Sequence, residues 1–249
     1  MRIALRPLAA ATLTILGACG SITDPSGSSQ QALAARKPPP PRAARPIVLF
    51  VHGYNSSGAV WATMVGRFRN DGWLTTELAT FSYNYNLSNA TTAATIKQKV
   101  DSIRQVNATT PIAIVTHSMG AMSARYYTRN LGGDAAVATV ITLAGANHGT
   151  NTAIFCGSAI SCQEMIPGSA FLNALNATDE TWGAPRYGTW WSNCDEVINP
   201  RSSALLAGAT NNQTACINHS ALHEDAKVYA SVRDFVNQSS PNAFIASAR

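Results

Sequence analysis

The sequence carries little charge, since only 12% of its 249 residues are Asp, Glu, Lys or Arg. The net charge of +5 is placed unevenly: six of the 18 basic residues but only one of the 13 acidic residues precede Pro46. The rest of the chain has 12 residues of each sign. Because nucleic-acid binding needs a basic surface, nucleic acid is not expected as a partner. We find no internal repeat.

No apolar run in the sequence is long enough to span a bilayer in the mature protein. An apolar stretch over residues 8–16 follows a basic start, which predicts an export signal over residues 1–18. The signal ends in Leu16-Gly17-Ala18-Cys19, which resembles the bacterial lipobox and predicts cleavage before Cys19 and lipidation of that cysteine. The alternative is an ordinary signal cut near residues 32–34. The protein is expected to be exported, as a cell-envelope lipoprotein attached to the membrane through Cys19 or as a secreted protein.

Residues 19–45 are rich in Ser, Gly, Ala and Pro, and they include KPPPPR at residues 37–42. This composition favours an extended tether behind the lipidated cysteine. Residues 46–249 are then expected to form one globular domain, because 46% of the whole chain is hydrophobic.

Cysteines are few, and besides Cys19 only four remain, an even number in a chain expected to be exported. Disulfides persist outside the cytosol, and four cysteines allow three pairings. The short spacing of Cys156 and Cys162 favours a local bridge, which leaves Cys194 to pair with Cys216.

Short apolar, β-rich runs alternate with segments of helical period after Pro46, which predicts an α/β fold with a mainly parallel central sheet and helices on both faces. Strands are expected at residues 47–51, 74–81, 112–115, 137–143 and 187–191. Helices are expected around residues 60–68, 96–104, 119–131 and 228–236.

A strand, a sharp turn and a helix meet at Ser118, within Thr116-His117-Ser118-Met119-Gly120. This segment matches the nucleophile elbow G-x-S-x-G except for Thr116 at its first position. The elbow is so tight that it needs small flanking residues, and it projects the serine hydroxyl above the sheet. Ser118 is therefore the candidate nucleophile.

A serine nucleophile needs a histidine base that is oriented by a carboxylate, and α/β-hydrolases place them in the chain order serine, acid, histidine. His219 and His223 satisfy this order. His219 is preferred because it lies in a loop, whereas His223 is expected to begin the last helix. Asp195 is the preferred acid because it follows a predicted strand. The alternative acids, which we interpret as solvated charges, are Asp179, Glu180 and Glu196.

The oxyanion of an ester intermediate needs two backbone N–H donors, commonly one after the nucleophile and one after the first strand. Met119 and Tyr54 occupy those places, and Gly53 permits close approach of the backbone to a substrate. A bridge between Cys194 and Cys216 would join the loops that carry the acid and the base. We therefore hypothesise that this bridge preorganises the triad.

Three segments carry a family resemblance: HGY at 52–54, THSMGA at 116–121 and TLAGANHGT at 142–150. Together with Asp195 and His219 in family order, they resemble the small bacterial triacylglycerol lipases, or lipase class 2, of the α/β-hydrolase superfamily. The resemblance runs from about residue 46 to residue 236. It implies a compact fold without a large lid domain and an exposed active site. Residues 151–185 depart from the family pattern, and they are interpreted either as a wall of the acyl pocket or as local core packing. The sequence does not decide whether they form a lid.

The resemblance implies a serine ester hydrolase, a lipase or carboxylesterase, that cleaves acyl esters through an acyl-enzyme intermediate. It requires neither a metal nor another cofactor, and it takes a lipid or another ester as substrate. A monomer is expected. The alternatives are a polyester or short-chain ester hydrolase and, from a different class, a non-catalytic surface lipoprotein that binds lipid or a partner.

Overall fold

A computed structural model describes residues 45–238, and the predicted signal, Cys19 and most of the tether lie outside the described residues. The described part contains a six-stranded sheet in the order β2-β1-β3-β4-β5-β6, in which every neighbouring pair is parallel. Parallel strands need crossover connections, which the helices provide. The strands are β1 (Ile47–Val51), β2 (Leu78–Thr80), β3 (Ile112–His117), β4 (Thr139–Leu143), β5 (Arg186–Trp191) and β6 (Thr210–Gln213).

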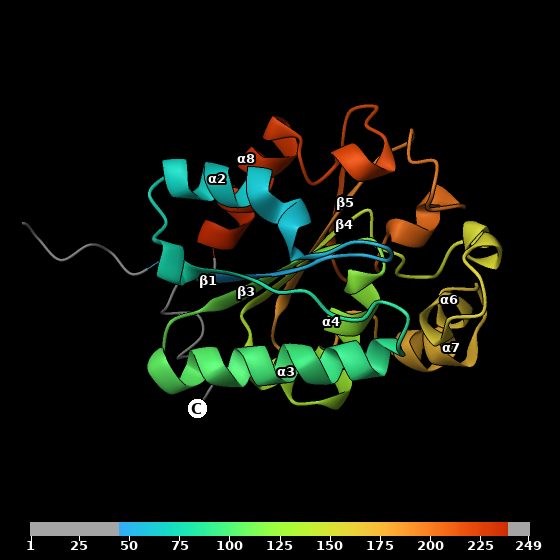
Figure 1. The fold of residues 1–249 in the computed structure, drawn as a ribbon, viewed down its shortest axis with the longest axis horizontal. Helices are drawn as coiled ribbons and strands as arrows, with labels where there is room; N and C mark the ends of the chain where they lie inside the picture. The colour runs from blue at the N-terminus through green and yellow to red at the C-terminus, as the bar shows by residue number, and fades with distance from the viewer. Residues whose placement is uncertain (1–44, 239–249) are drawn as a thin grey trace, which may run out of the picture. The chain divides into compact units, whose positions relative to one another are not determined.

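Helices cover both faces of the sheet, as Figure 1 shows with α2 and α8 on one face and α3 and α4 on the other, while α6 and α7 lie beyond one end of the sheet. The α-helices are α2 (Ala62–Asn70), α3 (Asn89–Val106), α4 (Gly120–Asn130), α5 (Gly133–Ala136), α6 (Ile160–Glu164), α7 (Ala170–Asn176) and α8 (Ala226–Asn237). The 3-10 helices are η2 (Gly58–Trp61), η3 (Thr75–Glu77), η4 (Asn151–Phe155), η5 (Arg201–Ala204) and η6 (His219–Ala221). This is the predicted α/β-hydrolase architecture.

The core explains why the central strands are continuously apolar. Successive side chains of a strand point to opposite faces, so a strand that is covered on both sides has no solvent-facing position. All five residues of β1 are buried. Phe50 packs with the α2 and α8 side of the core, whereas Leu49 packs with the α3 and α4 side.

The edges of the sheet differ from the sequence prediction. The strand expected over residues 74–81 is wrong in extent, since Thr75–Glu77 form a 3-10 helix and only Leu78–Thr80 pair with β1. The polar strand β6 was not predicted, because its sequence TNNQ has no apolar alternation and it pairs only with β5 among the described strands. The apolar pattern of the sequence predicts a strand that is buried on both faces, but it does not predict a strand at the solvated edge of the sheet.

Candidate active site

Ser118 lies in the turn between β3 and α4, in a backbone conformation that residues other than glycine rarely adopt. Its φ angle is +54°, in the left-handed region. Neighbouring backbone fixes this conformation: the Ser118 N–H donates to the Leu143 carbonyl at 2.9 Å, and the Ser118 carbonyl accepts from Ala121 and Ala146 at 3.1 and 3.2 Å. The ends of β4 and α4 therefore hold the candidate nucleophile in its strained turn.

Two glycines allow this turn to pack against the end of β1. A Cβ atom on Gly53 would lie 2.8 Å from the Cβ of Ser118, and a Cβ on Gly120 would lie 2.5 Å from the His52 carbonyl oxygen. Neither position has room for a side chain unless the backbone shifts. The small residues that the elbow requires are thus explained by contacts with the loop after β1.

Thr116, which departs from the elbow pattern, is accommodated inside the sheet. The side chain is buried, and its Oγ1 donates to the Ile141 carbonyl on β4 at 2.9 Å. The buried hydroxyl therefore has a hydrogen-bond partner, so a threonine at this position leaves no unsatisfied polar group in the turn.

Asp195 and His219 are brought together after β5 and at the start of η6. The Nδ1 atom of His219 lies 2.9 and 3.0 Å from the two carboxylate oxygens of Asp195. The Oδ1 atom of Asp195 also accepts from the N–H groups of Val197 and Ile198. Because the carboxylate only accepts, Nδ1 carries a proton, and in the neutral ring Nε2 keeps the lone pair that a base needs.

His117 and Glu196 hold the backbone of the candidate base. The Nε2 atom of His117 donates to the His219 carbonyl at 3.0 Å, and the His219 N–H donates to Glu196 Oε2 at 3.1 Å. The rings of His117 and His219 lie 4.6 Å apart, which places His219 beside the elbow. No hydrogen bond joins Ser118 Oγ to His219 Nε2 within residues 45–238, and such bonds are often long before substrate binds. Glu196 is exposed, as expected of a solvated charge, but its carboxylate also bonds to the backbone N–H of His219.

His223 is also placed differently from the prediction, because α8 begins at Ala226 and not at His223. The ring of His223 is buried between Trp61 and His117, at centroid distances of 5.7 and 4.8 Å. Asp195 bonds to His219 and not to His223. The geometry thus favours His219 as the base.

Glu180, interpreted as a solvated charge of a surface loop, is half-buried instead. Its Oε1 lies 2.7 Å from His148 Nε2, and its Oε2 accepts from the Ala207 N–H at 2.6 Å. These bonds lie in the loops after β4 and β5. Glu180 therefore holds loops together and does not orient His219.

Buried histidines predict a loss of stability in mild acid. Burial lowers the pKa of His52 and His223 and holds the pKa of His117 well below its usual value, where the neighbouring His219 and His223 add to the effect. As the pH falls through about 6.5, the unfolded chain binds protons that the folded chain excludes. We expect the free energy of unfolding in urea to fall between pH 7 and pH 5, by up to about 1.4 kcal/mol per pH unit for each histidine.

The control is His223→Leu, which removes one of these groups and should make the pH dependence shallower. A free energy of unfolding that stays constant or rises toward pH 5 in the wild type would contradict the assignment of neutral buried rings.

His52 orients the loop that carries Tyr54. Its ring stacks on Tyr83 with 4.0 Å between centroids, its Nδ1 donates to the Gly53 carbonyl at 2.8 Å, and its Nε2 accepts from the Tyr83 N–H at 3.3 Å. A trans peptide places C=O and N–H on opposite sides, so the Tyr54 N–H points away from the His52 ring. Within the described residues, neither the Tyr54 N–H nor the Met119 N–H has an acceptor. Both remain candidates for holding an oxyanion.

The two predicted disulfides are confirmed, Cys156 with Cys162 and Cys194 with Cys216. The second bridge joins the residue before Asp195 to the loop that leads to His219. Ser192 supports the same junction, since its Oγ accepts from the N–H groups of Cys194 and Ile217, both at 3.0 Å.

Removal of the Cys194–Cys216 bridge tests whether it preorganises the acid and the base. We expect Cys194→Ala/Cys216→Ala to lower stability by about 3 kcal/mol, from the 22-residue separation of the bridged cysteines, and to lower kcat about tenfold as Asp195 and His219 lose alignment. Thermal unfolding and ester turnover measure the two effects. The control is Cys156→Ala/Cys162→Ala, and a wild-type kcat for Cys194→Ala/Cys216→Ala would contradict preorganisation.

Residues 151–185 are tied to α3 and α4. The Glu164 carboxylate accepts from Ser88 Oγ and from the N–H of Asn89, at 2.5 and 2.7 Å, and Arg125 donates to Asn147 and Asn176. Buried side chains of the segment, which join the main core, are Ala153, Cys162, Met165, Leu172 and Leu175. The core-packing interpretation is confirmed for this buried side of the segment.

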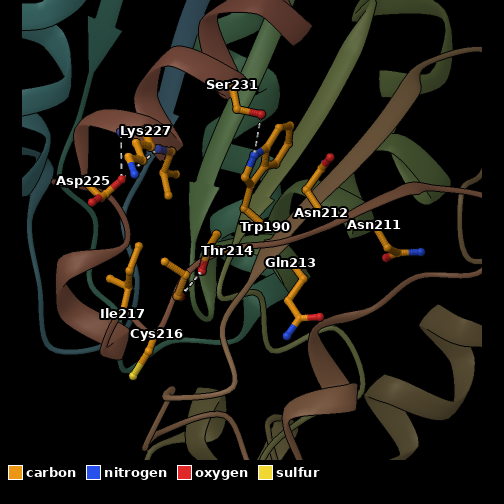
Figure 2. Close-up of a pocket in the computed structure, with 12 residues that line it drawn as sticks. Trp190, Asn211, Asn212, Gln213, Thr214, Cys216, Ile217, Asp225, Lys227 and Ser231 are labelled. Carbon is orange, nitrogen blue, oxygen red and sulfur yellow. Dashed lines mark hydrogen bonds between the residues drawn. The ribbon is translucent and has the colours of Figure 1, made fainter.

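A groove of about 710 Å³ lies beside β6 and α8, and its lining includes Trp190, Cys216 and Lys227 (Figure 2). Ser118, Asp195 and His219 do not line it. Two polar side chains of its wall are already bonded: Trp190 Nε1 donates to Ser231 Oγ, and Asn212 Nδ2 donates to the Thr189 and Thr210 carbonyls. The groove is therefore separate from the candidate active site.

Residues 45–238 contain no group of three or more His, Cys, Asp or Glu side chains placed to hold a metal ion. No helix among them is both long enough and apolar enough to cross a bilayer.

Comparison with known proteins agrees with this geometry. The family model described as "Lipase (class 2)" matches residues 44–238. No curated protein matches the chain by sequence.

Solved structures share the fold at low sequence identity. The mature lipase BlEst2 of Bacillus licheniformis matches with a TM-score of 0.70 and 17% identity, over 79% of this chain and 94% of that one. Aspergillus fumigatus lipase B matches with a TM-score of 0.65 and 13% identity, over 82% and 57%. The phospholipase PlaB of Legionella pneumophila matches with a TM-score of 0.62 and 13% identity, over 81% and 61%.

Proposed function

Because the chain belongs to the class 2 lipase family, we propose that it is a serine carboxylic-ester hydrolase that cleaves acyl esters of lipids, with Ser118, His219 and Asp195 as its catalytic residues. The observation that carries the proposal is the Asp195–His219 hydrogen bond beside a serine in a strained strand-to-helix turn. The preference for esters over amides comes from the family, since such a triad serves both reactions.

The reaction begins when Ser118 Oγ attacks the ester carbonyl carbon while its proton passes to His219 Nε2. Asp195 holds Nδ1–H and stabilises the imidazolium that forms. The carbonyl oxygen becomes an oxyanion, which accepts from the N–H groups of Tyr54 and Met119.

The tetrahedral intermediate then collapses and the bond to the alcohol breaks. The alcohol leaves with the proton from Nε2, and the acyl group remains on Ser118. Water attacks this acyl-enzyme, gives a proton to His219, and releases the carboxylic acid as the proton returns to Ser118. The cycle requires no cofactor.

Hydrolysis of p-nitrophenyl esters from acetate to palmitate tests the proposal and reports the chain-length preference. A maximum at long chains favours a lipase, and a maximum at acetate or butyrate favours a short-chain esterase. Hydrolysis of an insoluble polyester film would identify a polyester hydrolase. No turnover of any ester would favour the non-catalytic lipid-binding or partner-binding protein.

Export and anchoring form a second part of the proposal. The two disulfides are consistent with an exported protein. We propose that residues 1–18 are removed, that Cys19 is lipidated, and that residues 19–45 tether a monomeric catalytic domain to the cell envelope.

We expect Cys19→Ser to move the protein from the membrane fraction to the soluble fraction, because the lipid anchor is lost. Intact-mass spectrometry of the wild type should show an acylated N-terminal Cys19. A mature chain that begins near residue 35 and carries no acyl group would support plain secretion instead.

A further inference from the structure

Three large apolar side chains are exposed together on the segment after β4. Ile154, Phe155 and Ile160 have 63%, 85% and 56% of their surface exposed. Ile154 and Phe155 lie in η4, just before the loop that the Cys156–Cys162 bridge closes, and Ile160 lies within that loop at the start of α6. We call these three residues the apolar knob.

The segment that carries the knob is fixed. The disulfide closes it, Ser161 Oγ donates to the Tyr85 carbonyl at 2.5 Å, and Glu164 is bonded to the start of α3. Ala153 and Cys162 are buried in the main core. Because its base is held on several sides, the knob is presented outward by the fold, as expected of a contact surface.

The segment that carries the knob is bonded to two loops of the proposed active site. The Tyr54 hydroxyl donates to the Cys156 carbonyl at 3.1 Å, which joins the knob to the proposed oxyanion loop. On the other side, the Asn151 N–H donates to the Asn199 carbonyl at 2.7 Å, in the loop that follows Asp195. A surface that covers the knob would therefore lie close to the loops that carry Tyr54 and Asp195.

The segment that carries the knob has almost no charge. From residue 151 to residue 178 the only charged residue is Glu164, and its carboxylate is turned inward to Ser88 and Asn89. The knob is also small. A stable protein interface buries about 1,200 Å² or more, far more than three side chains supply, whereas insertion into lipid needs only the side chains that enter it.

We propose that the apolar knob inserts into the surface of an uncharged lipid aggregate and so holds the active site against its substrate. This inference rests on the proposed function for the identity of the lipid. It assigns to Phe155, with Ile154 and Ile160, a docking role that is separate from the chemistry at Ser118.

Binding is tested on the mature chain from residue 19 with Cys19→Ser, so that no acyl anchor contributes, and with Ser118→Ala, so that lipid is not consumed. Flotation with a triolein emulsion measures the bound fraction. We expect Phe155→Ser to lower partitioning about tenfold, because one large apolar side chain no longer leaves water. The matched control is Val106→Ser, which removes a 79% exposed apolar residue from the last turn of α3 and should leave partitioning unchanged.

Turnover separates docking from chemistry. With Ser118 restored, Phe155→Ser should keep kcat/KM for dissolved p-nitrophenyl acetate and lose about tenfold of the rate on emulsified triolein. Equal partitioning of the Phe155 and Val106 variants would overturn the proposal. So would a wild type that sediments as a dimer and becomes a monomer on Phe155→Ser, because the knob would then contact a second copy. Failure of the proposed function is distinct, since it appears as no turnover of dissolved ester by the wild type.

Discussion

Replacing Ser118 by Ala is expected to lower kcat for p-nitrophenyl butyrate by about 10⁵- to 10⁶-fold and to leave the fold intact. The hydroxyl forms the acyl-enzyme, and alanine offers no atom that can attack the ester. The turn itself is held by backbone bonds to Leu143, Ala121 and Ala146, which the substitution keeps. Pre-steady-state measurement of p-nitrophenol release should show no acylation burst.

Non-additivity provides the control for this prediction. His219→Ala should lower kcat to a similar extent, and the double variant Ser118→Ala/His219→Ala should be no worse than either single variant, because the two residues act as one unit. His148→Ala, which changes a histidine bonded to Glu180 and not to Asp195, should retain activity within about tenfold. Turnover by Ser118→Ala above about one thousandth of the wild-type rate would assign the nucleophile elsewhere.

The sequence predicted the central part of the fold, and it singled out the candidate residues, because the signals of both are local. β3, the elbow and α4 follow one another within Ile112–Asn130, and their residue types are dictated by burial and by a turn with no room for side chains. The chain order serine, acid, histidine then selected Asp195 and His219 as the candidate acid and base. Cysteine spacing predicted both disulfides, since Cys156 and Cys162 are separated by only six residues.

The residues that support the site could not be predicted in the same way, because their partners are distant in the chain. His117 bonds to the carbonyl of a residue 102 positions later. His223 packs against Trp61, which lies in η2 near the start of the described residues and so is far from His223 in the chain. Glu196 looks like a solvated charge beside Asp195, and only the folded loop turns it toward the His219 N–H. No period or motif encodes such contacts.

Asp195→Asn is expected to lower kcat about 10⁴-fold at neutral pH while stability changes little. The asparagine Oδ1 can still accept from Val197 and Ile198, so the loop keeps its shape. Its Nδ2 would instead donate to Nδ1 of His219, which places the ring proton on Nε2. That tautomer cannot take the proton of Ser118, and no carboxylate stabilises the imidazolium.

Glu196→Gln is the matched control, because it changes the neighbouring carboxylate to an amide whose oxygen still accepts from the His219 N–H. Its kcat should stay within about tenfold of the wild type, since Glu196 positions backbone and does not contact the ring nitrogens. Two measurements separate a wrong tautomer from a disordered loop: kcat between pH 5 and pH 9, and thermal unfolding. A wrong tautomer lowers kcat without changing thermal unfolding, whereas a disordered loop changes both. If Asp195→Asn retained wild-type turnover and Glu196→Gln lost it, the orienting carboxylate would be Glu196, and the hydrogen bond from His219 to Asp195 would serve stability alone.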